Sequence, residues 1–290
     1  MKSLLISLLV LSAAASAQEA IPAGTVLPAE LSTSLDSGKS TPGQVITARI
    51  MQDVPLPAGR IPAGARIVGH IVSVAPAMDG SGTEVALQFD ALRFFHRSIP
   101  ITVDLRALAS MMEVEDAQIP STGTDRGTPW AWMTTNQIGG EVVYGQGGPV
   151  MNGSRSVGGA APGGVLVHLS AKPGSMCQGE TGDDDRLQAL WVFASDACGL
   201  YGFRDLEITH AGRTNPVGQI RISSTQGRLH IQGGSGLLLR VIAQERPLSK
   251  SGGVYDVSST KLLVGRNAGL VGTIGPAVSG TASQFPVSVK

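Results

Sequence analysis

Apolar and polar residues alternate along the first part of the chain, which is the pattern of β-strands that bury one face. Turn residues separate five alternating segments: 27–35, 46–54, 68–74, 85–89 and 99–105. Gln52 is the exception in the second segment, where the alternation calls for an apolar side chain. Because nothing between these segments has helical periodicity, the pattern predicts an all-β fold built as an antiparallel β barrel or sandwich.

The same turn motif, Ile-Pro-Ala-Gly, occupies residues 21–24 and 61–64. With proline second and glycine fourth, each copy suits a type I turn. We interpret both copies as connections between strands without a binding role.

The middle of the chain is richer in glycine, and clean alternation returns only in three late segments: 219–223, 228–232 and 237–242. These late segments are suited to pair with the open edges of the first strands. We therefore predict one interleaved β-barrel domain formed by residues 18–106 and 216–246, with residues 107–215 inserted as a Gly-rich β/loop region. Two barrels in series are the alternative. Residues 247–290, with few charges and recurring glycines, are predicted to be a flexible tail.

The chain begins with the features of a secretory signal peptide. Lys2 precedes an apolar run at residues 4–11, and small residues follow up to Ala17. We expect cleavage after Ala17 and a periplasmic or secreted location. The run is shorter than the roughly 20 apolar residues of a membrane span, and no later segment reaches that length, so no transmembrane segment is expected in the mature chain.

The charge composition limits the classes of partner that the chain would attract electrostatically. The 22 basic and 22 acidic residues leave a formal charge of zero, so the chain has no net field that would gather nucleic acid or an anionic membrane surface. Glycine (38) and proline (17) are abundant and only 15% of residues are charged, which argues against long exposed helices. A hydrophobic content of 42% is enough for a folded core.

Cys177 and Cys198 are the two cysteines of the chain. Outside the cytoplasm such a pair favours a disulfide, because two ligands alone do not form a zinc site. Two free buried thiols are the alternative.

Candidate catalytic and metal-binding chemistry is sparse. Ser195, Asp196 and His210 are the residue types of a hydrolase triad, but no Gly-x-Ser-x-Gly elbow surrounds the serine. We expect Ser195 and Asp196 to shape the turn before Cys198. The acids at 183–185 suit a solvated loop better than a calcium site, and the five histidines lack metal-ligand spacing. The sequence thus predicts no catalytic residue, no cofactor and no metal.

Trp130 and Trp132 are the candidate contacts to a ligand or partner. They flank Ala131, so on a strand their rings would share one face and could stack on a sugar or a protein. The alternative is that they pack against the domain's own surface.

Three stretches near the amino terminus carry a family resemblance: Ile21 through Leu31, Thr41-Pro42-Gly43-Gln44-Val45 with Asp53-Val54, and Ile61 through Gly69. Together they resemble the β-barrel domain of TrbI-type conjugal-transfer proteins, the periplasmic scaffold of type IV secretion channels. The middle region resembles secreted acidobacterial-type proteins whose function is not established. The TrbI-type resemblance implies a barrel fold.

These observations favour a non-enzymatic interaction or structural protein of the cell envelope, with envelope proteins or polysaccharide as partners. The alternative is an extracellular carbohydrate-binding module or a polysaccharide hydrolase or lyase.

Overall fold

The computed structural model describes residues 20–77, 80, 82–120, 134–145, 147–172, 174, 175, 177, 186–209, 211–213 and 215–243. Several sequence predictions concern residues outside these ranges: the signal peptide at 1–17, Trp130, Trp132, the acids at 183–185, His210 and the tail at 247–290.

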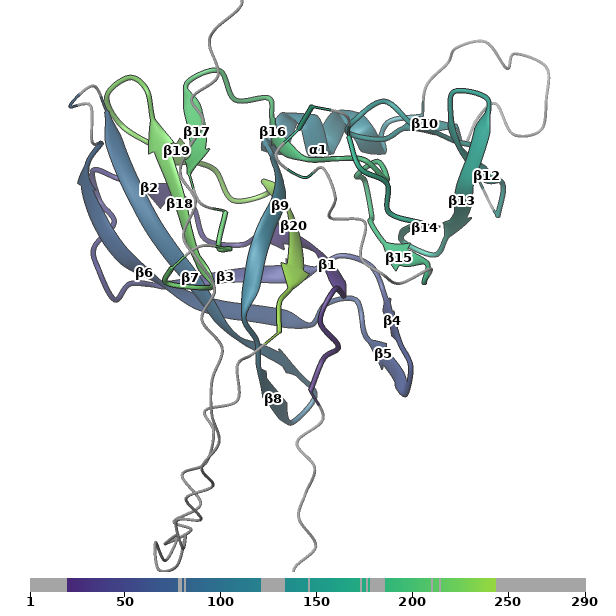
Figure 1. Ribbon diagram of the computed structural model, residues 1–290, viewed down its shortest axis with the longest axis horizontal. Coiled ribbons are helices and arrows are strands. Elements are labelled where there is room, and N and C mark those ends of the chain that lie inside the picture. The colour runs from purple at the N-terminus through teal and green to yellow at the C-terminus, as the bar shows by residue number, and fades with distance from the viewer. Residues whose placement is uncertain are drawn as a thin grey trace, which may run out of the picture. The chain divides into compact units, whose positions relative to one another are not determined.

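A large sheet that nearly closes into a barrel dominates the described chain, and the all-β prediction is confirmed (Figure 1). Its strand order is β16-β9-β20-β1-β3-β6-β7-β18-β17, with β8 paired to β7. Neighbours are antiparallel except β16, which is parallel to β9. The strands are β1 (Val26–Leu31), β3 (Val45–Ile50), β6 (Arg66–Pro76), β7 (Thr83–Phe94), β8 (Arg97–Pro100), β9 (Val103–Ala109), β16 (Gly199–Tyr201), β17 (Leu206–Thr209), β18 (Gln219–Ser224) and β20 (Gly236–Val241).

A second sheet of six short strands follows chain order as a meander, formed by β10 (Thr135–Asn136), β11 (Val142–Val143), β12 (Pro149–Asn152), β13 (Arg155–Ala161), β14 (Gly164–Val167) and β15 (Gln188–Ala189). Two small pairs complete the strands: β2 (Leu35–Asp36) with β19 (His230–Ile231), and β4 (Val54–Leu56) with β5 (Gly59–Ile61). The described helix, α1 (Met111–Gln118), begins after Ser110, whose hydroxyl accepts a hydrogen bond from the Glu113 amide at 3.3 Å.

Strands from both ends of the described chain share one sheet and one core. β20 lies between β1 and β9, while β18 pairs with β7. Apolar side chains fill the barrel interior and leave a cavity of about 10 Å³, at the lower limit for one water molecule. Its lining is entirely apolar: Leu31, Leu35, Leu87, Phe89, Leu105, Leu108, Ile220, Ile222, Ile231 and Leu237.

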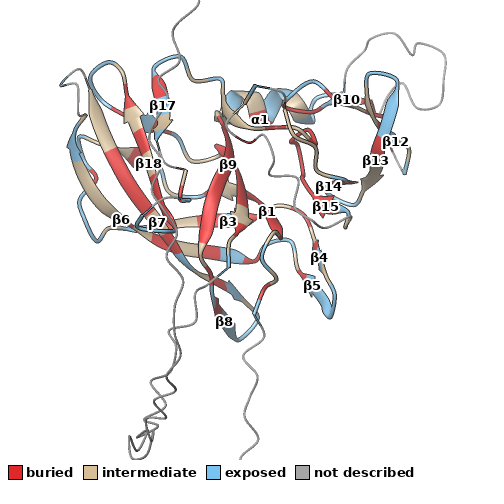
Figure 2. Ribbon diagram, in the orientation of Figure 1, coloured by how far each residue is buried: buried red, intermediate tan, exposed pale blue. Residues whose placement is uncertain are grey.

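Strand β9 is buried along its whole length, on both faces (Figure 2). Val103, Leu105 and Leu108 belong to the barrel core. Ala107 and Ala109 belong instead to a second apolar cluster, which contains the side chains of the six-stranded sheet and also Val26 and Leu238 from β1 and β20. The wall formed by β1, β9 and β20 is therefore covered by the barrel core on one side and by the six-stranded sheet on the other.

The predicted fifth strand, 99–105, is two strands. β8 pairs with β7 and β9 pairs with β20. The change of partner occurs at two residues, where the Ile101 amide still donates to Asp90 and the Thr102 carbonyl accepts from Ile242. Alternation continues through this change, so the sequence carries no local signal for it.

Residues 199–209, which the sequence analysis placed in the inserted region, form β16 and β17 and pair with the large sheet. The helix α1 and the long hairpin of β12 and β13 were not predicted. Gly158 and Gly159 lie inside β13, where an added Cβ on Gly158 would meet the backbone of Leu166 and Val167. Glycine here permits close approach of neighbouring strands rather than marking a loop.

The two Ile-Pro-Ala-Gly turns lie one residue later than predicted. The carbonyls of Pro22 and Pro62 accept from the amides of Thr25 and Ala65, at 3.2 and 3.1 Å. Glycine thus occupies the third turn position with φ of 85° in both copies, the conformation that a type II turn requires. The type I assignment was wrong because glycine is needed for its positive φ.

Leu239→Ala tests the shared core. Leu239 is fully buried and lies between Leu27 and Leu105 in the register of the three strands. We expect a loss of about 2 to 5 kcal/mol in the free energy of unfolding, measured by urea denaturation, with a single cooperative transition. A stably folded proteolytic fragment ending near Ala107 would contradict the shared core.

Candidate functional site

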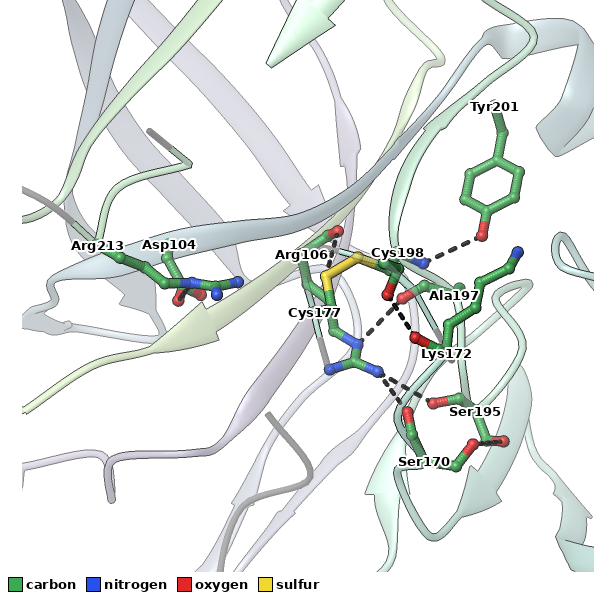
Figure 3. Close-up of a disulfide and its surroundings, with 11 residues drawn as sticks. Asp104, Arg106, Ser170, Lys172, Cys177, Ser195, Ala197, Cys198, Tyr201 and Arg213 are labelled. Carbon is green, nitrogen blue, oxygen red and sulfur yellow. Dashed lines mark hydrogen bonds and ion pairs between the residues drawn. A yellow bond between two sulfur atoms is a disulfide. The ribbon is translucent and has the colours of Figure 1, made fainter. Parts of the chain in front are cut away.

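A buried polar cluster lies where the outer face of β9 meets the six-stranded sheet (Figure 3). At its centre is Arg106, which is 1% exposed and lies at a bulge in β9, where the pairing with β20 shifts register. Its guanidinium donates to three backbone carbonyls: Ala197 (Nε, 3.1 Å), Ser170 (Nη2, 2.8 Å) and Ser195 (Nη2, 3.3 Å). A bulge is a device that redirects a side chain, and here it aims a charge at the loop that carries Cys198.

The Ser195 side chain contacts Glu141 and the hydroxyl of Ser170, which is 2.8 Å away, rather than Asp196. The Ser195 amide donates to Glu141 Oε2 at 2.8 Å and its hydroxyl to Oε1 at 2.5 Å. The Ala197 amide donates to the Ala194 carbonyl, so Ser195 and Asp196 occupy the centre of a turn before Cys198, as predicted. The Ser195 side chain is buried and hydrogen-bonded to the Glu141 carboxylate, so this contact holds the turn in place.

A disulfide joins Cys177 and Cys198, whose Cα atoms are 5.9 Å apart, in agreement with the sequence prediction. The hydroxyl of Tyr201 accepts from the Cys198 amide at 3.0 Å, and Lys172 Nζ lies 5.6 Å from the centre of the Tyr201 ring. Arg106 therefore holds the loop before Cys198 against β9 by hydrogen bonds, and the disulfide joins that loop covalently to Cys177, whose Sγ lies 3.6 Å from the Arg106 carbonyl oxygen.

Two buried glutamines also join the sheets. The Gln52 side chain accepts from the amides of Trp191 (2.8 Å) and Val165 (3.3 Å) and donates to the Val165 carbonyl at 2.8 Å. Gln188 accepts from the Val26 amide at 3.1 Å. The polar exception in the alternating pattern, Gln52, thus satisfies backbone groups of the second sheet that would otherwise be buried without partners.

On the outer face of the same wall, a buried carboxylate, Asp104, lies among arginines that are only partly buried. Asp104 accepts from Arg213 Nε at 2.9 Å and lies opposite Arg240 in the β9–β20 register. Burial raises the pKa of Asp104, and the neighbouring arginines only partly offset this effect. Burial, reinforced by Arg240 and Arg213, lowers the pKa of Arg106 to about 10, so Arg106 is charged near neutral pH.

Within the described ranges, no group of three or more His, Cys, Asp or Glu side chains lies close enough together to hold a metal ion. No helix of this part of the chain is long and apolar enough to cross a membrane. The sequence matches no protein-family model, and it matches no curated protein. Function must therefore be argued from the geometry.

Arg106, Glu141 and Gln188 were not predicted as members of the polar cluster. A signal exists for Arg106, since Asp104 and Arg106 interrupt an apolar run in which every residue is buried. A charge in such a run needs partners. Glu141 and Gln188 give no comparable signal, because they lie in short strands and loops whose partners are far away in sequence.

Arg106→Met tests the structural role of the cluster. The substitution keeps the apolar stem but removes the donors to the carbonyls of Ala197 and Ser170. Because each buried carbonyl left without a partner costs about 1 to 3 kcal/mol, we expect a loss of roughly 2 to 5 kcal/mol in the free energy of unfolding. The control Arg155→Met, on exposed Arg155 of β13, should change it by less than about 0.5 kcal/mol. Equal effects in urea denaturation would rule out this role.

Asp104 predicts a pH effect with a definite sign. Because its pKa is higher in the folded state than in the unfolded chain, the folded state binds the proton more tightly. Its contribution to stability is therefore largest at low pH and falls as pH rises through the folded-state pKa. In Asp104→Asn this group does not titrate. The difference in unfolding free energy, wild type minus variant, should decrease in urea denaturation as pH rises from about 4, near the unfolded-state pKa, through the folded-state pKa. An increase would show that the arginines outweigh burial.

Proposed function

We propose that this chain is a non-enzymatic interaction protein of the cell envelope, acting outside the cytoplasm through its surface. The observation that carries the proposal is the filled barrel interior, where ten apolar side chains leave about 10 Å³. A barrel that encloses a small molecule needs a cavity of several hundred Å³. The filled interior thus stabilises the barrel, and the outer surface of the barrel is the part suited to recognition.

The buried polar groups support the same proposal. Arg106, Glu141 and Gln52 are all bonded to backbone or side chains that join the two sheets. The strongest candidate nucleophile, Ser195, is among them and is buried. These side chains are engaged in assembling the structure.

The extracytoplasmic location rests on two features. The signal-peptide pattern ending at Ala17 is one, and the disulfide between Cys177 and Cys198 is the other, since disulfides persist in oxidising compartments. The resemblance to the TrbI-type barrel points to an envelope scaffold of the same fold class. The role as a carbohydrate-binding module or polysaccharide hydrolase or lyase rests on Trp130 and Trp132, which lie outside the described residues.

An export and sedimentation experiment tests this function. The full chain is produced in a Gram-negative host, and a variant with Leu8→Arg and Leu9→Arg in the apolar run serves as the export control. We expect the wild type outside the cytoplasm, beginning at Gln18 and with no free thiols by mass spectrometry, and the control inside. The purified mature chain should then sediment with isolated envelope fragments.

Three results would overturn the proposal. The first is an uncleaved wild-type chain in the cytoplasm. The second is a mature chain that remains in the supernatant whichever envelope fraction is sedimented with it. The third is cleavage of a polysaccharide by the purified chain. The last result would favour the hydrolase or lyase.

A further inference from the structure

Three arginines form a row across the outer face of the barrel. Arg49 of β3 lies directly opposite Arg66 of β6, and Arg66 lies directly opposite Arg93 of β7. All three are exposed, and the neighbours Ile50, Ile67 and Leu92 point into the barrel core. Since adjacent strands are about 4.8 Å apart, the three Cα atoms lie within roughly 10 Å.

Folding does not explain this row, because like charges directly opposite each other on a sheet are destabilising. Arg49 is the member with an acidic partner, Glu30, at 3.3 Å. Arg66 and Arg93 have no ion-pair partner among the residues that the structure describes. Acids on neighbouring segments are engaged elsewhere, Asp53 with Arg60 at 2.9 Å and Asp90 with His70 at 2.7 Å. The row therefore carries an excess of positive charge, although the chain as a whole has none.

An aromatic residue lies close to the row along the chain, and its ring meets that of Phe94 edge-on, with the ring centroids 5.9 Å apart. Phe95, at the β7–β8 turn two residues after Arg93, is 85% exposed. The turn is among the exposed segments in Figure 2. Its φ is 50°, a region that bulky residues rarely adopt. Neither burial nor backbone preference favours phenylalanine here, and such outliers are concentrated at functional positions.

We propose that the row of Arg49, Arg66 and Arg93, together with Phe95, binds an acidic polysaccharide, a polymer of sugars that carry carboxylates. This inference rests on the proposed envelope function and names its partner. A guanidinium binds a carboxylate through two parallel hydrogen bonds, and a series of carboxylates along one chain would relieve the repulsion within the row. The exposed ring of Phe95 offers a flat apolar surface to a sugar ring.

The position of the row argues against a peptide added as a strand. β3 is paired on both sides, with β1 and β6, and β6 is paired with β3 and β7. No free backbone edge is available there, and strand addition depends on one. A planar membrane also fits poorly, because the row crosses three strands of a curving sheet (Figure 1). A flexible polymer can follow that curve using side-chain contacts alone.

Binding of an alginate oligomer, a chain of uronate sugars, tests the proposal by calorimetry at low salt, with neutral dextran as the comparison. We expect the mature chain to bind alginate and not dextran. The affinity of the double variant Arg66→Gln with Arg93→Gln for alginate should be at least about tenfold lower than that of the wild type. A matched control, Arg155→Gln with Arg204→Gln, loses the same charge at exposed sites elsewhere and should stay within about twofold.

Thermal unfolding separates recognition from folding. Removing the repulsion should leave the melting temperature of the row variant unchanged or higher, while its binding falls. Phe95→Asn should behave in the same way, since asparagine tolerates a positive φ. Replacing Arg66 and Arg93 with lysine keeps the charge but removes the two parallel hydrogen bonds that a guanidinium donates to a carboxylate. The affinity of this lysine variant for alginate should lie between those of the wild type and the glutamine variant.

Equal binding of alginate and dextran, or equal losses in the row and control variants, would overturn the proposal. Binding to phosphatidylglycerol vesicles without binding to alginate would assign the row to a membrane instead. If the row variant still sediments with envelope fragments and wild type ignores alginate, the row fails while the envelope function stands.

Discussion

Strand β9 is buried on both faces, and the arrangement of both sheets depends on that constraint. A charged residue inside such a strand must find hydrogen-bond partners, since solvation is lost. Arg106 finds them in two carbonyls of the loop that carries Cys198, those of Ser195 and Ala197, and in the carbonyl of Ser170 after β14. These hydrogen bonds hold the six-stranded sheet and its loops against the barrel wall, and Gln52 joins the two sheets at a second point.

The same wall closes the barrel. β20 comes from the end of the described chain and lies between β1 and β9, so the barrel core forms only when residues far apart in sequence have met. The interior is then filled by aliphatic and aromatic side chains. With the interior filled and the polar cluster engaged in assembly, the outer face of the barrel is the surface to which we assign the proposed recognition.

On the outer face of the barrel, the residues proposed to bind a partner are ones that folding stability alone would not favour. Arg66 and Arg93 repel each other across neighbouring strands, and Phe95 exposes its ring at a positive φ. Positions where local preference and fold disagree are where function is expected. A net charge of zero did not reveal the row, because net charge averages over the surface whereas binding responds to local charge.

The sequence by itself determined the β class, most strands of the barrel and the turn that contains Ser195 and Asp196. Period-two alternation and turn chemistry are local properties and can be recognised within a few residues. Tertiary structure decided the rest: the change of partner between β8 and β9, the joining of β16 and β17 to the large sheet, and the partners of Gln52 and Arg106. It also decided that three arginines, 17 and 27 positions apart in the chain, form one row. These features depend on which distant strands become neighbours, and that choice is made by burial of the whole barrel rather than by any one segment.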